Sequence, residues 1–253
     1  MIVIYLVFII VLFLPSIAGA WGPLTHLYLG SQVIDLGAGV IPAGIYMLLK
    51  RFRKDFLYGN LSADVILGRR FQEYKKNSHN WSIGWRLLES AKTQRQKAFA
   101  YGYLTHLSAD TVAHNQRSAT IPFGHSLLEM KSDSMIDRNH RKTLKSIDRV
   151  IQKRNDILLE NVLESVVFSF KTNKRIFKGV LLLSRLPNYR PVSNFFHNRL
   201  NYEISLVDIQ NFHQESIEKM LDILINGEDS DVLKEEPLGR HLYNGISHNQ
   251  VAR

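Results

Sequence analysis

The chain has 253 residues, which is enough for one sizeable domain with a full hydrophobic core. Its hydrophobic content of 45% and charged content of 22% are ordinary for a globular protein, and its net charge of +9 favours an anionic partner, either a phospholipid membrane or nucleic acid. There is no cysteine, which excludes a disulfide, a disulfide-linked partner, cysteine-ligated zinc and thiol catalysis.

Residues 1–20 have the pattern of an export signal. They open with an almost wholly apolar stretch, too short to span a membrane comfortably, and end in Ala18, Gly19 and Ala20, which suit signal cleavage. Cleavage after Ala20 makes Trp21 the first residue of a secreted or periplasmic protein. The charged start of a typical signal is missing, so the alternative is an uncleaved segment that anchors the protein in a membrane.

Helical spacing of apolar residues runs through most of residues 21–226. Gly37–Gly44 is predicted as a loop between two helices, and further helices are expected over residues 82–98, 156–170, 174–186 and 203–226. No strand alternation and no internal repeat is present. We therefore predict an all-α fold, with a single multi-helix domain over residues 21–226. The mixed charge, glycine and proline of residues 227–253 predict a loosely structured tail.

The richest stretch for chemistry lies near the middle of the chain. His106, Asp110 and His114 recur at every fourth residue, and four helical residues turn about 40° beyond a full turn, so all three share one face of a helix. His125 and Glu129 repeat the same spacing. Zinc favours this mixture of imidazole and carboxylate. The alternative is two amphipathic helices with satisfied polar residues, and two linked sets favour the metal site.

Further residues of the same types lie earlier in the chain. The complete set comprises Trp21, His26, Asp64, His79, His106, Asp110, His114, His125 and Glu129. In kind and in order these residues resemble the zinc-dependent phospholipase C family, which shares its trinuclear zinc site with the S1/P1 nucleases. The resemblance covers roughly residues 21–129, and no motif of the family is found in residues 130–253.

The resemblance implies a domain of the phospholipase C/P1 nuclease type that holds up to three zinc ions. The first zinc would be bound by Asp64, His79, His106 and Asp110. The second would be bound by Asp110, His26, and the α-amine and carbonyl oxygen of Trp21, and the third by His114, His125 and Glu129. Only cleavage after Ala20 would free the amine that the second zinc requires.

The activity that the resemblance implies is phospholipase C-type cleavage of phospholipids by an exported hydrolase. Zinc lowers the pKa of bound water to about 7 and so supplies hydroxide at neutral pH. Asp64 is the candidate catalytic residue, which would orient or deprotonate the attacking water. The partner would be a phospholipid or another anionic phosphodiester, with peripheral membrane contact. Two alternatives stay open: an S1/P1-type nuclease acting on single-stranded nucleic acid, for which no aromatic platform can be placed, and a non-catalytic zinc-binding or lipid-binding domain.

Overall fold

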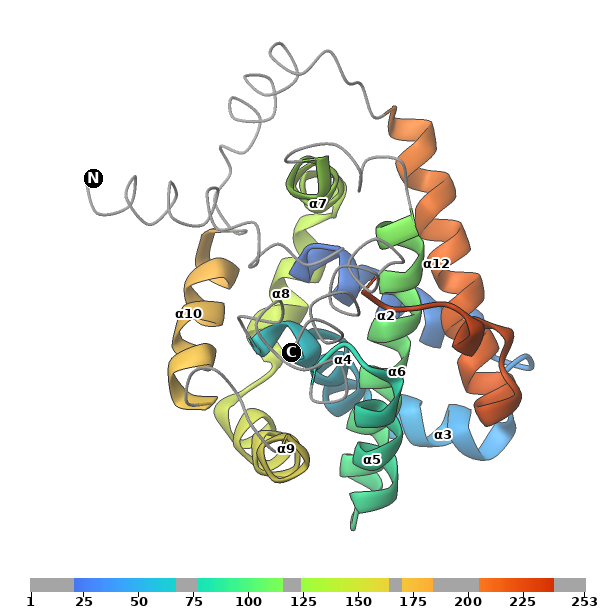
Figure 1. Cartoon of the computed structure of the whole chain (residues 1–253), viewed down its shortest axis with the longest axis vertical. Coiled ribbons are helices and arrows are strands. Elements are labelled where there is room, and N and C mark those ends of the chain that lie inside the picture. The colour runs from blue at the N-terminus through green and yellow to red at the C-terminus, as the bar shows by residue number, and fades with distance from the viewer. Residues whose placement is uncertain (1–20, 67–76, 116–123, 164–169, 184–204, 239–253) are drawn as a thin grey trace, which may run out of the picture.

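The computed structural model describes residues 21–66, 77–115, 124–163, 170–183 and 205–238, and in these ranges the protein is helical without any strand (Figure 1). The α-helices are α2 (Pro23–Leu36), α3 (Ala43–Arg51), α4 (Arg53–Ser62), α5 (Trp81–Ser90), α6 (Gln94–Asn115), α7 (Gly124–Met135), α8 (Arg138–Ser146), α9 (Arg149–Val162), α10 (Phe170–Leu183) and α12 (Leu206–Asn226). Short 3-10 turns are η1 (Ala63–Val65), η5 (Gly227–Asp229) and η6 (Asp231–Lys234). The predicted all-α fold with one multi-helix domain is confirmed. None of the described helices is long and apolar enough to cross a membrane.

Helix α6 is the central element of the fold. It packs against α4, α12 and α5, and Figure 1 shows it running through the middle of the helices. Nearly every residue from Ala98 to His114 is buried, polar side chains included. A helix that is buried on all sides lacks the single apolar stripe of a surface helix. The polar residues of α6 are therefore held inside the protein, where each needs a partner or a ligand.

Two glycines allow α4 and α6 to cross at very short distance. A Cβ atom at Gly59 would lie 2.1 Å from the carbonyl oxygen of Phe99, and one at Gly102 would lie 2.0 Å from that of Phe56. Real side chains cannot approach backbone atoms so closely, so only glycine fits at either position. The crossing brings the end of α4, with Asn60 and the following η1 turn, against the middle of α6.

The boundaries of several elements differ from the sequence expectations. The loop between α2 and α3 covers residues 37–42, because Ala43 and Gly44 of the predicted loop already belong to α3; Gly39 within it has a positive φ of 77°. The prediction of one helix over residues 82–98 is wrong, because α5 ends at Ser90 and α6 begins at Gln94. The backbone amide of Gln96 donates to the hydroxyl of Thr93, and the Gln96 side chain accepts from the Thr93 amide, which is a capping box that starts a new helix.

The second half of the chain contains helices in a stretch for which the sequence predicted no particular element. The strongly charged stretch 131–155 forms the end of α7, all of α8 and the start of α9, with Asp137 and Asp148 capping the last two. The predicted helix over residues 156–170 ends at Val162 instead, and residues 164–169 lie outside the described part of the chain. The helices predicted over 174–186 and 203–226 correspond to α10 and α12.

The start of the C-terminal tail is held more closely than expected. The carboxylate of Asp222 in α12 accepts hydrogen bonds from the Ser230 hydroxyl at 2.5 Å and the Val232 amide at 3.1 Å. Lys219 forms a 2.7 Å ion pair with Glu235. These contacts fold residues 227–238 back onto α12, which hydrophobic periodicity alone could not reveal. Residues 239–253, like residues 1–20, lie outside the described residues, so the expectations for them stay predictions.

Candidate metal centre

His106, Asp110 and His114 lie on one continuous helix, as their spacing predicted, because α6 extends unbroken from Gln94 to Asn115. The side chains of His106 and Asp110 are completely buried, and His114 lies in the last turn with 6% of its surface exposed. A hydrogen bond at Nδ1 fixes the orientation of the His106 imidazole: this nitrogen donates to the backbone carbonyl of Asn60 at 2.8 Å. A carbonyl can only accept, so this bond leaves Nε2 of the neutral ring with a lone pair for a ligand.

His79 reaches the same point from the segment before α5. Its backbone amide donates to the Asn77 side chain at 2.9 Å, and its Nδ1 lies 3.1 Å from the Ser78 hydroxyl. The hydroxyl of Tyr103 on α6 donates to the Ser78 carbonyl, which ties this segment to the central helix. As with His106, contacts at Nδ1 and the backbone fix the ring so that Nε2 faces inward.

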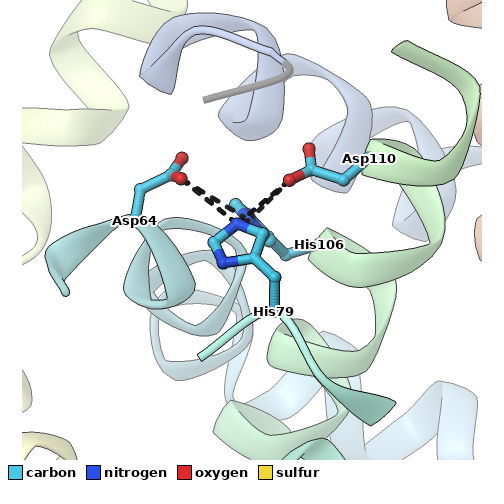
Figure 2. A group of neighbouring side chains, drawn as sticks. All are labelled: Asp64, His79, His106 and Asp110. Carbon is cyan, nitrogen blue, oxygen red and sulfur yellow. Dashed lines mark hydrogen bonds and ion pairs between the residues drawn. The ribbon is translucent and has the colours of Figure 1, made fainter. Parts of the chain in front are cut away.

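Four side chains from three parts of the chain converge at this point. Each of Asp64, His79, His106 and Asp110 offers one ligand atom within 4.8 Å of the others, and Figure 2 shows the two imidazoles between the two carboxylates. Nε2 of His79 lies 3.1 Å from Asp110 and 3.3 Å from Asp64. Nε2 of His106 lies 3.3 Å from Asp110 and 3.2 Å from Nε2 of His79. These four are the residues that the resemblance assigns to the first zinc.

His26 adds a third imidazole, beside His106 and the other carboxylate oxygen of Asp110. It lies in the first turns of α2, fully buried, with its Nε2 3.2 Å from Oδ1 of Asp110 and 3.9 Å from Asp64. Its ring stacks on that of His106, with centroids 3.9 Å apart. Asp110 thus stands between His26 on one oxygen and His79 and His106 on the other. This arrangement agrees with the role that the resemblance implies for Asp110, a carboxylate shared by two zinc ions.

The residues of the cluster fit a bound cation on their own geometry. Among the described residues, both carboxylate oxygens of Asp110 and both ring nitrogens of His26 have no hydrogen bond of acceptable geometry, although all are buried. Buried polar atoms without such bonds are costly. Close oxygens and nitrogens that are not aligned on one another are typical of ligands that share a metal ion. The donor set, three imidazoles and two carboxylates, suits zinc.

The charges of the cluster depend on one another. Burial favours a neutral Asp110, yet the neighbouring imidazoles, His106 first, hold its pKa well below its usual range. Burial also opposes a charged His106, but the carboxylates of Asp110 and Asp64 raise its pKa. For His26, burial and then the charge of His106 lower the pKa. Asp110 therefore remains a carboxylate and His26 a neutral imidazole, which are the forms that bind a metal.

Trp21 is fully buried, and its indole serves packing. The indole Nε1 donates to the carbonyl of Ala109 at 3.0 Å and lies 3.2 Å from the hydroxyl of Ser216, while the ring meets His213 edge-on. Ala109 directly precedes the cluster residue Asp110, so Trp21 is fixed beside the site. Ligation of the second zinc through its amine and carbonyl oxygen stays a prediction, since it depends on cleavage after Ala20.

The third predicted set is only partly described. His114 is buried at the end of α6, while Glu129 is half-buried on α7, one turn after His125. The helical spacing of His125 and Glu129 agrees with the sequence expectation. The side chain of His125 lies outside the described residues, so the assignment of these three residues to one zinc stays a prediction.

Asp133 supports the site and was missed by sequence reasoning. Its carboxylate, on α7, accepts from the backbone amides of Leu24 and Thr25 at 3.3 and 2.8 Å and from the Thr25 hydroxyl at 2.7 Å. It thereby caps the start of α2, where Gly22 has no side chain for this purpose. A Cβ at Gly22 would lie within 2.5 Å of all three carboxyl atoms. Nothing local could predict a cap that is more than 100 residues away in the chain.

Comparison with known families supports the geometry. A family model described as zinc-dependent phospholipase C matches residues 25–173, which is more than half of the chain. The chain belongs to this family. The match begins one residue before His26 and includes the whole four-residue cluster. It also continues through α7, α8 and α9, well beyond the sequence resemblance, which ended near residue 129. No curated protein and no solved structure matches the chain.

Proposed function

We propose that this protein is an exported zinc-dependent hydrolase that cleaves phospholipids on the glycerol side of the phosphate, as a phospholipase C does. The observation that carries the proposal is the convergence of Asp64, His79, His106 and Asp110 on one point in a family of zinc-dependent phospholipases C. Export is supported by the apolar residues 1–20 and their small residues at the end.

The cluster would hold zinc through these four residues, and His26 with the amine and carbonyl of Trp21 would complete a second position at Asp110. Zinc, when bound, would supply a Lewis acid that acidifies water and offsets charge on the phosphodiester. The chain itself holds the ligands in place: the Asn60 carbonyl orients His106, and Asp133 fixes the start of the helix that carries His26.

Asp64 is the best-placed group to move a proton. Its side chain is 13% exposed, whereas those of His26, His79, His106 and Asp110 are 0% exposed, so among these residues it alone can be reached from solvent. A carboxylate oxygen of Asp64 would accept a proton from the attacking water as its oxygen bonds to phosphorus. The bond to the glycerol oxygen then breaks, and that oxygen takes up a proton to give diacylglycerol.

The test combines metal content with two substrates. The purified protein should contain zinc and release a phosphorylated head group from phospholipid vesicles, and Asp64→Asn should lose this activity. Asp229→Asn, on an exposed turn, serves as the matched control and should keep it. Cleavage of single-stranded DNA in place of phospholipid would establish the nuclease alternative. Bound zinc with no hydrolysis of either substrate would indicate a non-catalytic domain.

The predicted role of the amino terminus has its own test. A peptide nitrogen has no lone pair free to coordinate, since resonance commits it to the planar peptide bond. A protein that retains Ala20 should therefore hold one zinc fewer than a protein that starts at Trp21, and it should be inactive. Equal zinc content and equal activity of the two forms would refute the amine as a ligand.

A further inference from the structure

The corner of the molecule formed by α3 and its neighbours exposes apolar side chains. Leu36, Val40 and Met47 have 51%, 52% and 62% of their surface exposed. Val150 and Ile157 on α9 and Leu206 and Val207 on α12 are comparably exposed, so exposure alone does not distinguish this corner. Exposed apolar side chains become typical of a contact surface where polar or charged residues surround them.

Positive charge lies directly beside these apolar residues. Residues 35–54 contain Lys50, Arg51, Arg53 and Lys54 but only one acidic residue, Asp35, which pairs with Arg53 at 2.9 Å. Arg95, at the start of α6, joins them across space. Among the described residues, no acidic side chain lies within salt-bridge distance of Lys50, Arg51 or Arg95. Their charges are therefore open to an anionic partner.

The cations are arranged around aromatic rings and a pocket. The guanidinium carbons of Arg51 and Arg95 lie 5.5 and 5.4 Å from the centre of the Phe52 ring, so both groups contact the same aromatic side chain. The ammonium of Lys50 lies 5.8 Å from the Tyr46 ring. A pocket of about 490 Å³ opens here, with Met47, Leu48 and Phe52 as its apolar lining and Lys50, Arg51 and Gln94 as its polar lining.

The exposed face of α3 is apolar in its first half and positively charged in its second half. Ala43, Gly44 and Met47 form its first half, and Lys50 and Arg51 follow on the same side at helical spacing. A helix with apolar residues followed by cations suits the boundary of a bilayer. There the apolar groups enter the edge of the hydrocarbon while the cations meet lipid phosphates.

The surface is separate from the metal centre. His26 lies near the start of α2 and Leu36 is the last residue of that helix, ten residues later. At 1.5 Å per residue this places them about 15 Å apart along the helix. In Figure 1, α3 lies at the edge of the molecule, away from α7 and α8. Contact with a membrane at α3 therefore needs no change at the metal ligands.

We propose that the surface made by Met47, Leu48, Lys50, Arg51, Phe52 and Arg95 docks the protein on a membrane of anionic phospholipids. The proposal goes beyond hydrolysis, because it concerns where the protein binds and does not depend on the proposed activity. Charge selects the partner: three open cations beside exposed apolar groups complement an acidic lipid surface, whereas a neutral bilayer offers them no counter-charge.

The test measures sedimentation of the purified protein with vesicles. One set contains phosphatidylglycerol and phosphatidylcholine, and the other phosphatidylcholine alone. The difference between the sets isolates the charge-dependent contact from any binding by residues 1–20. Each cation near an anionic surface contributes about fivefold to binding, so the double variant Arg51→Gln and Arg95→Gln should weaken binding to the anionic vesicles about 30-fold. Met47→Ser should weaken it about tenfold through lost apolar contact.

Matched controls remove the same groups elsewhere. Arg149→Gln with Arg175→Gln removes two exposed cations on α9 and α10, and Val150→Ser removes an apolar side chain that is 70% exposed. These controls should bind anionic vesicles almost as well as the unchanged protein. An equal loss in the control pair, or no loss in the α3 variants, would overturn the proposal. So would an α3 variant that keeps its vesicle binding but loses binding to a single-stranded oligonucleotide.

A separate measurement keeps docking distinct from catalysis. All variants are assayed on a soluble short-chain phosphodiester, for which docking is irrelevant. If the proposed activity exists, the α3 variants should keep it, because no metal ligand is altered. If the protein hydrolyses nothing, the vesicle measurement still decides the docking proposal. A loss of both vesicle binding and soluble activity in the α3 variants would place the surface at the catalytic site and overturn its separate role.

Discussion

Gly102→Ala tests whether the close crossing of α4 and α6 holds the metal ligands in place. The added Cβ would lie 2.0 Å from the carbonyl oxygen of Phe56 and 3.0 Å from the Cα of Gly59. Non-bonded atoms normally approach to about 3.5 Å, so the two helices would have to separate by roughly 1 Å or more. The obstructing atoms belong to the backbone and cannot rotate away.

The magnitude follows from two opposing effects. Overpacking a well-packed interior costs about 1–3 kcal/mol, and rigid backbone at the contact places this variant at the upper end. Alanine in place of glycine inside a helix contributes about 1 kcal/mol of stability in return. The net loss should be about 2 kcal/mol, a large part of the stability of a typical domain. Separation of the helices would also weaken the bond between Asn60 and His106, and loss of such an orienting bond lowers metal affinity about 10–100-fold.

Urea unfolding of the zinc-free protein and zinc titration of the folded protein would measure the two effects. Gly179→Ala is the matched control, because it lies inside α10 and its new Cβ would meet nothing within 4 Å. It should raise stability by about 0.5–1 kcal/mol and leave zinc affinity unchanged. If Gly102→Ala proved as stable as the unchanged protein and bound zinc equally well, the role assigned to this crossing would be refuted.

Three further perturbations address the site and its support. His106→Ala should lose zinc, whereas the control His140→Ala should keep it. Chelation with EDTA should lower the melting temperature of the unchanged protein but not that of His106→Ala. Identical melting curves of the unchanged protein with and without EDTA would argue against metal binding. Asp133→Ala should lower the free energy of unfolding in urea by about 2 kcal/mol, because three donors at the start of α2 lose their acceptor. The control Ser134→Ala, at the exposed residue next to it, should change this free energy by less than about 0.5 kcal/mol. Burial lowers the pKa of His213 from 6.5 to about 4, so between these pH values the unfolded chain binds a proton that the folded protein does not. The free energy of unfolding should therefore fall by up to about 3 kcal/mol as the pH drops through this window. In His213→Gln, the free energy of unfolding should change less with pH over the same range.

The parts of the site that sequence predicted are those encoded at short range. His106 and Asp110 share a face because they are four residues apart on a helix, and this holds however the rest of the chain folds. The all-α fold follows in the same way from periodicity. Joining Asp64 and His79 to this helix required the family's order of ligands, since no spacing rule connects residues so far apart.

The parts that sequence could not predict depend on long-range packing. The contact of Gly59 with α6 and the cap that Asp133 provides for α2 both join segments with no common pattern. The surface at α3 was visible only in part: the basic residues 50–54 are plain in the sequence, but Arg95 joins Arg51 at Phe52 only in the folded protein. The break before α6 was different: Thr93 and Gln96 have the spacing of a capping box, and apolar periodicity outweighed that signal.

The support of the amino-terminal segment shows how the metal centre depends on the complete fold. The four residues of the cluster lie between residues 64 and 110, on the η1 turn, in the segment before α5 and on α6. Trp21, by contrast, is held by Ala109 on α6 and by Ser216 on α12, while Asp133 on α7 fixes the turn that follows it. The position beside His26 can form only when helices from both halves of the chain have packed. Residues distant in the sequence thus hold Trp21 and the start of α2 in place, which couples completion of the site to completion of the fold.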